Sequence, residues 1–328
     1  MQIAKTFLSI LVFVLLSACV STSVKESTLG TIDVSPEMVL NSSPLGEGTE
    51  NLDLSSVDIL EMTPEMIEFV ESYMEGSTNR YRRMQRLVHA IIGDGNFNLV
   101  YDDKTRTASE TFTAARGNCL SFTNLFIAMA RYLEIHAEYQ EVDIPPDWSL
   151  AGESFFFSQH VNVLVDLGVG MQRVVDFNIY DFQPTYERRT ITDARGRAHY
   201  FSNIGVEHMM NGNNTLAYAN FRQALKEDSR FSPAWINMGI LHRREKYPNF
   251  AETSYKQALE IYQFNLIAMS NLANLYEEEG KSEWAEQYKD RVRLHRMSNP
   301  YYRYAQANTA FIDGDYRTAI ENLKYAIN

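Results

Sequence analysis

One cysteine, Cys119, lies where the sequence favours thiol chemistry. It follows a short polar turn, Arg116-Gly117-Asn118, and precedes a stretch of helical periodicity that ends near residue 133. The glycine of the turn allows a close approach of the backbone. The apolar residues that follow recur at the spacing of one buried helix face, and they are Phe122, Leu125, Phe126, Met129 and Leu133. The pattern predicts that Cys119 stands at the N-terminus of a helix.

The N-terminus of a helix stabilises an anion, because its first backbone N–H groups are unpaired and the helix dipole is positive there. A thiolate is favoured in that setting, and the thiolate is the reactive form of cysteine. Cys119 is therefore a candidate nucleophile. The alternative is a small buried apolar side chain, which is what most free cysteines are.

A predicted β-hairpin could supply a base and a carboxylate. Residues 160–167 and 171–177 have the character of strands, and Gly168-Val169-Gly170 separates them. If these three residues form the loop, with the glycine at 170 in the left-handed conformation, the numbers of opposed residues sum to 338. A two-residue loop would change this sum and move Asp176 to the other face of the hairpin.

The three-residue loop places His160 opposite Asn178, with Asp176 on the diagonal of the same face. Opposed and diagonal side chains lie within roughly 4.5 to 8 Å, so the imidazole could reach either polar group. His160 alone could be an ordinary surface histidine, but beside Asp176, and with Cys119 upstream, it becomes a candidate base. The opposite face should be core, and it carries Val161, Val163, Val165 and Leu167.

The second cysteine, Cys19, ends a secretory signal. It follows Lys5, an apolar run over residues 7–16 and then Ser17-Ala18, and the run is too short for a confident membrane span. The Leu-Ser-Ala-Cys ending resembles a bacterial lipobox, which implies removal of residues 1–18 and lipidation of Cys19. An uncleaved anchor is the alternative. Lipidation would leave Cys119 as the one thiol in an oxidising compartment, where an unpaired thiol risks oxidation.

Residues 19–55 are predicted to be a flexible tether, because they are rich in small, polar and helix-breaking residues and have no sustained periodicity. The folded body begins at Thr63-Pro64-Glu65, which offers an N-cap, a proline at the first helical position and an acid in the first turn. A second helix is expected from about Asn79 to Gly93. Its arginines are interpreted as a solvated face, and they are Arg80, Arg82, Arg83 and Arg86.

Three short motifs together resemble a known family. Gly117-Asn118-Cys119 opens a helix, His160 starts a strand and Val174-Val175-Asp176 lies on the next strand. Their order, and separations of 41 and 16 residues, resemble the transglutaminase-like superfamily, which has an α+β papain-type fold. The resemblance covers roughly residues 60–190 and places this domain at residues 56–195. It implies that Cys119 is the nucleophile, His160 the base and Asp176 the acid that orients the imidazole.

The implied reaction is attack on an amide carbonyl to give a thioacyl enzyme. Water as acceptor makes the protein a peptidase or amidase, and a primary amine makes it a transglutaminase. Hydrolysis is favoured because water is always available. A domain without activity, serving as a scaffold for envelope complexes, is the other alternative. Many members carry an aromatic residue soon after the histidine, where this chain has Val161-Asn162-Val163, so the substrate channel should differ.

Small residues recur every 34 positions in the C-terminal part of the chain. The two series are Ala217, Ala251, Ala285 and Ala319, and Gly205, Gly239, Ala273 and Ala307. This period resembles tetratricopeptide repeats, in which small residues lie where paired helices touch. Residues 198–328 are therefore predicted to form an all-α solenoid of four repeats, whose groove would hold a protein partner. Alternatively, the repeats only brace the first domain.

Charge and composition narrow the expected partners. The formal net charge is −12, and no cluster of Lys and Arg with interleaved aromatic residues offsets it, so nucleic acid is not expected. Neither a metal-ligand spacing nor a Gly-rich phosphate loop is present, so no cofactor or metal is expected. The expected protein is a bacterial envelope lipoprotein that acts on a protein or peptide. Val20 after Cys19 resembles sorting to the outer membrane, with the body facing the periplasm.

Overall fold

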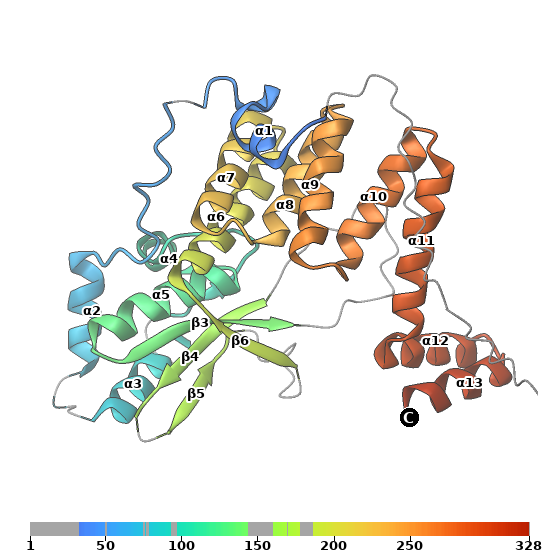
Figure 1. Cartoon of the computed structure of the whole chain (residues 1–328). Coiled ribbons are helices and arrows are strands. Elements are labelled where there is room, and N and C mark those ends of the chain that lie inside the picture. The colour runs from blue at the N-terminus through green and yellow to red at the C-terminus, as the bar shows by residue number, and fades with distance from the viewer. Residues whose placement is uncertain are drawn as a thin grey trace, which may run out of the picture. The chain divides into compact units, whose positions relative to one another are not determined.

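The described residues between 64 and 191 form helices and two small sheets, and the described residues after them are mostly helical (Figure 1). The computed structural model describes residues 33–49, 51–74, 76, 79–92, 97–143, 160–168, 170–177 and 186–327. The helices of the first part are α2 (Pro64–Met74), α3 (Arg80–Ile92), α4 (Ala108–Ala114) and α5 (Cys119–Tyr132). Its strands are β1 (Val100–Tyr101), β2 (Arg116–Gly117), β3 (His136–Asp143), β4 (His160–Asp166), β5 (Gln172–Val175) and β6 (Glu187–Ile191).

The larger sheet has the strand order β5-β4-β3-β6, and its neighbouring strands are antiparallel. β1 and β2 form a separate parallel pair. β4 is hydrogen-bonded on both edges, to β3 and to β5. The backbone at His160, the first residue of β4, is therefore fixed by the sheet.

The β4–β5 hairpin has the register that the three-residue loop predicted. Val163 pairs with Val175 and Asp166 with Gln172, so the numbers of opposed residues sum to 338. The N–H of Leu167 donates to the carbonyl of Met171 at 2.9 Å, and the glycine at 170 has a φ of 74°. This prediction is confirmed. Residue 178 lies outside the described residues.

α5 packs against β3 and β4 (Figure 1), and the valines of β4 share one hydrophobic core with its apolar residues. Val161, Val163 and Val165 are each at most 2% exposed, as the register predicted. α5 is buried on every side from Leu120 to Ala130, more than the single apolar face that its periodicity indicated. The reason is that α5 is packed not only against the sheet but also against α4, α3 and α2.

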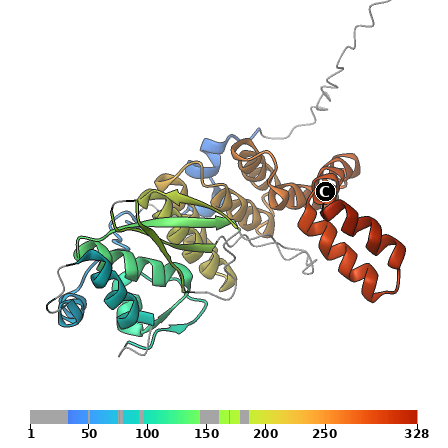
Figure 2. The same ribbon diagram turned by 90° about the horizontal axis from the view of Figure 1, so that it is seen from below.

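The C-terminal part consists, within the described residues, of four helical hairpins. Consecutive helices pair, and the first two hairpins lie side by side in both views (Figure 1, Figure 2). The helices are α6 (Asp193–Met210), α7 (Asn214–Glu227), α8 (Ser232–Arg244), α9 (Pro248–Ile261), α10 (Leu266–Glu278), α11 (Ser282–Met297), α12 (Pro300–Ile312) and α13 (Tyr316–Ala326).

The residues spaced by 34 positions lie where the helices of a hairpin touch. A Cβ at Gly205 would lie 2.5 Å from the ring of Phe221, and a Cβ at Gly239 would lie 2.5 Å from the ring of Tyr255. These two pairs are 34 residues apart, so one glycine-to-aromatic contact occurs in two hairpins. The alanines of the first series are at most 3% exposed, and they are Ala217, Ala251, Ala285 and Ala319.

Part of the predicted tether is folded. Residues 33–49, which we call the docked segment, contain α1 (Pro36–Asn41) and the short 3-10 helix η1 (Pro44–Gly46), which contact α9 and α7 (Figure 1). Val39 is fully buried, the hydroxyl of Tyr218 donates to its carbonyl at 3.0 Å, and Ser43 Oγ lies 2.8 Å from Nε2 of His242. The tether prediction was wrong here because the few apolar residues of the segment find partners about 200 positions away. Residues 19–32 lie outside the described residues.

Among the residues that the structure describes, no helix combines the length and the apolar character needed to cross a membrane. Cys19 and the predicted signal peptide lie outside these residues. The lipid anchor therefore stays a prediction.

Candidate active site

Cys119 is the first residue of α5, as its sequence context predicted. Asn118 caps the helix, because its Oδ1 accepts the N–H of Ser121 at 2.9 Å. Cys119 as a residue is half-buried. It therefore lies at the positive end of a buried helix without being fully buried itself.

The turn before Cys119 is held by the loop of residues 104–106. The N–H of Asn118 donates to the carbonyl of Lys104 at 3.2 Å, and its Nδ2 donates to Oγ1 of Thr105 at 2.7 Å. Gly117 lies so close to the first turn of α5 that a Cβ there would be 2.4 Å from Cβ of Ser121. A residue with a side chain at position 117 would displace the turn that positions the thiol.

His160 lies between the other two members of the predicted set. It is 9% exposed, its Nε2 lies 2.7 Å from Oδ2 of Asp176, and Cys119 is close enough to raise its pKa. Burial by itself lowers the pKa of His160, but the hydrogen bonds to Asp176 and Cys119 outweigh it and raise the pKa to about 10. The imidazole is therefore protonated at neutral pH.

A fourth side chain, Asn162, was not singled out by the sequence. It is 1% exposed, and its Nδ2 donates to the same Oδ2 of Asp176 at 2.9 Å. The carboxylate of Asp176 is thus held from two sides, by His160 and by Asn162. The signal that could have found Asn162 is the period of two residues along a strand, which puts residues 160 and 162 on one face.

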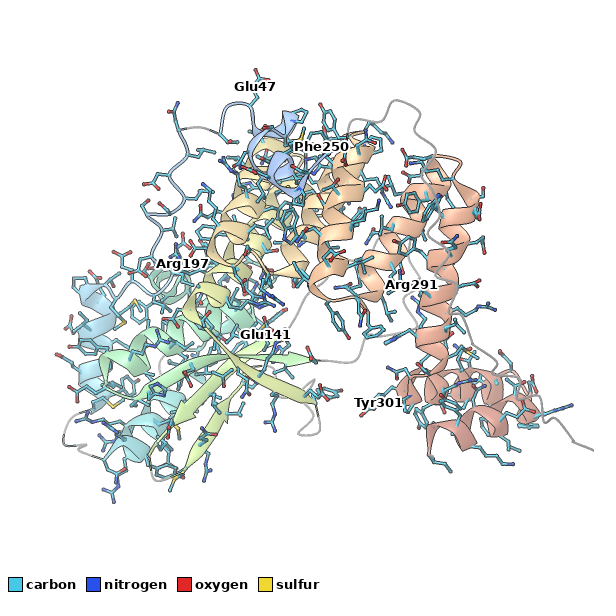
Figure 3. The ribbon with its side chains drawn as sticks, viewed as in Figure 1. Glu47, Glu141, Arg197, Phe250, Arg291 and Tyr301 are labelled. Atoms are coloured by element: carbon cyan, nitrogen blue, oxygen red, sulfur yellow. The ribbon has the colours of Figure 1, made fainter. Side chains whose placement is uncertain are left out.

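The strand beside His160 is fixed to α6 through a buried carboxylate, that of Glu141 on β3 (Figure 3). The Oε1 atom of this carboxylate accepts hydrogen bonds from Nε of Arg195 at 2.8 Å and from Nε2 of His199 at 2.6 Å. Burial alone would raise the pKa of Glu141, but the hydrogen bonds to these two residues and their charges lower it. Val142, the next residue, pairs with His160. The first helical hairpin therefore anchors the strand next to the candidate base.

α6 also reaches the loop that holds the turn before Cys119. Oε1 of Glu207 accepts the N–H of Thr105 at 2.8 Å. A cavity of about 660 Å³ lies at this contact, and its lining includes Lys104, Arg106, Tyr200 and Glu207. It does not include the three predicted site residues.

The structure brings Cys119, His160 and Asp176 together, although they lie on α5, at the start of β4 and directly after β5. Two arginines of α3 bind backbone carbonyls away from the three predicted residues: Arg83 donates to the carbonyl of Leu133 and Arg86 to that of Tyr73. Within the described ranges, no group of three His, Cys, Asp or Glu side chains could hold a metal ion.

Residues 67–164 match the family model of the transglutaminase-like superfamily. The matched range includes Cys119 and His160, and Asp176 lies 12 residues beyond its end. No curated protein matches the chain. The chain thus combines a transglutaminase-like domain with a mostly helical C-terminal region.

Proposed function

We propose that the protein is a thiol enzyme that acts on amide bonds of proteins or peptides, as a peptidase or amidase, through Cys119, His160 and Asp176. The observation that supports this most is the position of His160, whose Nε2 lies 2.7 Å from Oδ2 of Asp176 and whose pKa is raised by both Asp176 and Cys119. Many members of the transglutaminase-like superfamily use these three residue types in this order.

In the proposed mechanism the protonated imidazole of His160 stabilises the thiolate of Cys119, together with the N-terminus of α5. The thiolate attacks the amide carbonyl, and His160 gives its proton to the leaving amine. The backbone N–H of Cys119 is one donor to the oxyanion that forms. The neutral imidazole then takes a proton from water, and the water oxygen attacks the thioester. Hydrolysis releases the acid product and regenerates the thiolate of Cys119 beside the protonated imidazole of His160. Asp176 keeps Nε2 protonated and Nδ1 directed at the sulfur.

A protein-binding role is proposed for the C-terminal part. The glycine-to-aromatic contact that recurs after 34 residues supports an assignment as tetratricopeptide repeats, and such repeats present a groove to a protein partner. We further propose that Cys19 carries the lipid that anchors the protein to the bacterial outer membrane, facing the periplasm. The alternative is that the repeats only brace the first domain. The hydrogen bonds of α6 with Glu141 and with Thr105 support this alternative.

The first experiment measures the activation of Cys119. The rate of its alkylation by iodoacetamide at pH 7 is followed by peptide mass spectrometry in the wild type and in His160→Ala. An activated thiol reacts at least tenfold faster in the wild type, because the variant lacks the cation beside the sulfur. Equal and slow rates would refute the thiol enzyme and favour the inactive scaffold.

The second experiment separates hydrolysis from amine transfer. The wild type and Cys119→Ser are incubated with a mixture of peptides and a labelled primary amine. The proposal predicts new peptide termini that depend on Cys119 and little labelled product. Labelled product without new termini would instead identify a transglutaminase.

A further inference from the structure

Two large apolar side chains are exposed together beside the candidate nucleophile. Val100 and Tyr101 form β1, and each is 55% exposed. Tyr101 is opposite Gly117 of β2, two residues before Cys119. Single exposed apolar residues are ordinary on protein surfaces. These two differ because Tyr101 stacks on another aromatic ring close to the candidate site.

Tyr101 is the outer member of a column of three rings. The ring centroids of Tyr101 and Phe177 are 6.4 Å apart with 18° between the planes, and those of Phe177 and Phe122 are 4.9 Å apart with 24°. Phe122 is 1% exposed and lies on the first turn of α5 with Cys119. Phe177 directly follows Asp176. The column therefore runs from the buried ring of Phe122, near Cys119 on α5, through Phe177, next to Asp176, to the exposed ring of Tyr101.

The strand that holds Tyr101 is fixed on the side that faces β2. The N–H of Val100 donates to the carbonyl of Ala115 at 3.0 Å, and the N–H of Asp102 donates to that of Gly117 at 3.1 Å. The carboxylate of Asp102 also binds both terminal nitrogens of Arg106, at 2.8 and 3.0 Å. A preformed aromatic surface loses little freedom when a ligand covers it.

We propose that Val100, Tyr101 and Phe177, which we call the aromatic ledge, bind an aromatic side chain of the substrate next to the amide that Cys119 attacks. The inference rests on the proposed function and adds the substrate class. Aromatic pairs are favourable at centroid separations of about 4.5 to 7 Å, and the column already has this spacing, so a substrate ring extends it by one member. Many members of the superfamily carry an aromatic residue soon after the histidine, where this chain has Val161-Asn162-Val163. The ledge supplies an aromatic surface from another part of the chain.

The test compares two alkylating agents that differ by one ring, iodoacetamide and N-benzyl iodoacetamide, on the full chain. The rate of alkylation of Cys119 is measured for each agent by peptide mass spectrometry. The benzyl rate is divided by the iodoacetamide rate, and this ratio is then divided by the same ratio for glutathione, which corrects for the different intrinsic reactivities of the two agents. We expect a preference of about fivefold for the benzyl compound in the wild type. Tyr101→Ala should abolish it, and Tyr101→Phe should retain it because the ring remains.

Tyr262→Ala is the matched control, because Tyr262 is 53% exposed and its ring lies 6.2 Å from that of Phe264. This variant should keep the preference. A wild-type ratio equal to that of glutathione, or a preference that survives Tyr101→Ala, would overturn the aromatic ledge. The proposed function is tested separately by the iodoacetamide rate itself. If this rate is the same in the wild type and in His160→Ala, the proposed function fails. The ratio is measurable in either case, because it does not depend on how reactive the thiol is.

Discussion

At the scale of single residues, the site depends on the charge of one imidazole. The raised pKa of His160 has its physical cause in two hydrogen bonds that outweigh burial, one to Asp176 and one to Cys119. A cation held in this way beside a thiol stabilises the thiolate over a wide range of pH. The reactivity of Cys119 should therefore follow the titration of His160.

We expect the alkylation rate of Cys119 to change little between pH 6 and 9 in the wild type, because His160 with a pKa of about 10 stays protonated over that range. In His160→Ala the rate should fall by about two hundredfold from pH 9 to pH 6, as it does for an ordinary thiol. The measurement is the rate with iodoacetamide at each pH. A wild-type profile parallel to that of the variant would contradict the ion pair.

The same raised pKa fixes the sign of a stability effect. Its folded value lies above the value of 6.5 for a free histidine, so the contribution of His160 to the free energy of unfolding is fully present below pH 6.5. It is lost as the pH rises through about 10. Urea unfolding should therefore show His160→Ala to be destabilised at pH 6, and progressively less so as the pH rises from about 6.5 to about 10.

Asn162 should act as a positioning residue. Asn162→Ala removes one of the donors to Asp176 and should slow the alkylation of Cys119 at pH 7 by about tenfold, the value of one hydrogen bond to a charged group. Leu164→Ala, the next position on the same face of β4, controls for lost packing and should leave the rate within twofold. If the two variants slow the reaction equally, Asn162 acts only through packing.

At the scale of elements, the buried carboxylate of Glu141 joins the larger sheet to α6. The Glu141 side chain is fully buried and lies against Arg195, which is 14% exposed. Arg195 in turn binds Oδ2 of Asp228 at 2.8 Å. A buried carboxylate in such a network is stable only while all of its donors are in place.

Glu141→Gln should lower the free energy of unfolding by about 3 kcal/mol, because the substitution leaves the largely buried guanidinium of Arg195 without the counter-charge of Glu141. The measurement is urea unfolding at pH 7. Glu187→Gln on the neighbouring strand is the control, since Glu187 is exposed and its loss should cost less than about 0.5 kcal/mol. Equal effects would show that the Glu141 network does not stabilise the fold.

At the scale of the whole molecule, the docked segment and the helical hairpins form one folded surface. The contact between Ser43 and His242 joins residues 199 positions apart. His242 is fully buried, and this burial lowers its pKa to about 4. Its Nδ1–H donates to the carbonyl of Met238 at 2.9 Å, so Nε2 accepts the hydroxyl hydrogen of Ser43.

The burial of His242 should make the protein sensitive to acid. The unfolded chain binds a proton at residue 242 below about pH 6.5, and the folded protein excludes it until about pH 4. The free energy of unfolding should therefore fall by about 3 kcal/mol as the pH drops through that range. Other groups titrate there too, so the measurement is the difference between urea unfolding of the wild type and of His242→Gln at pH 7 and 4.5. An equal loss in both would refute this account.

The sequence by itself determined the features that depend on neighbouring residues. The start of α5 follows from Asn118 and the apolar period after it, because a cap and a helix face are local. The register of the β4–β5 hairpin follows from three loop residues, since loop length sets which residues face each other. That register was enough to place His160 and Asp176 on one face.

Only the tertiary structure decided which distant surfaces meet. Nothing near Glu141 in the sequence indicates Arg195 and His199, which lie more than 50 positions away on α6. The docked segment reads as a tether because its composition is polar, and it folds because α7 and α9 present partners for it. Contacts of this kind depend on the shape and spare hydrogen-bonding groups of a folded surface, and these exist only after the local elements have packed.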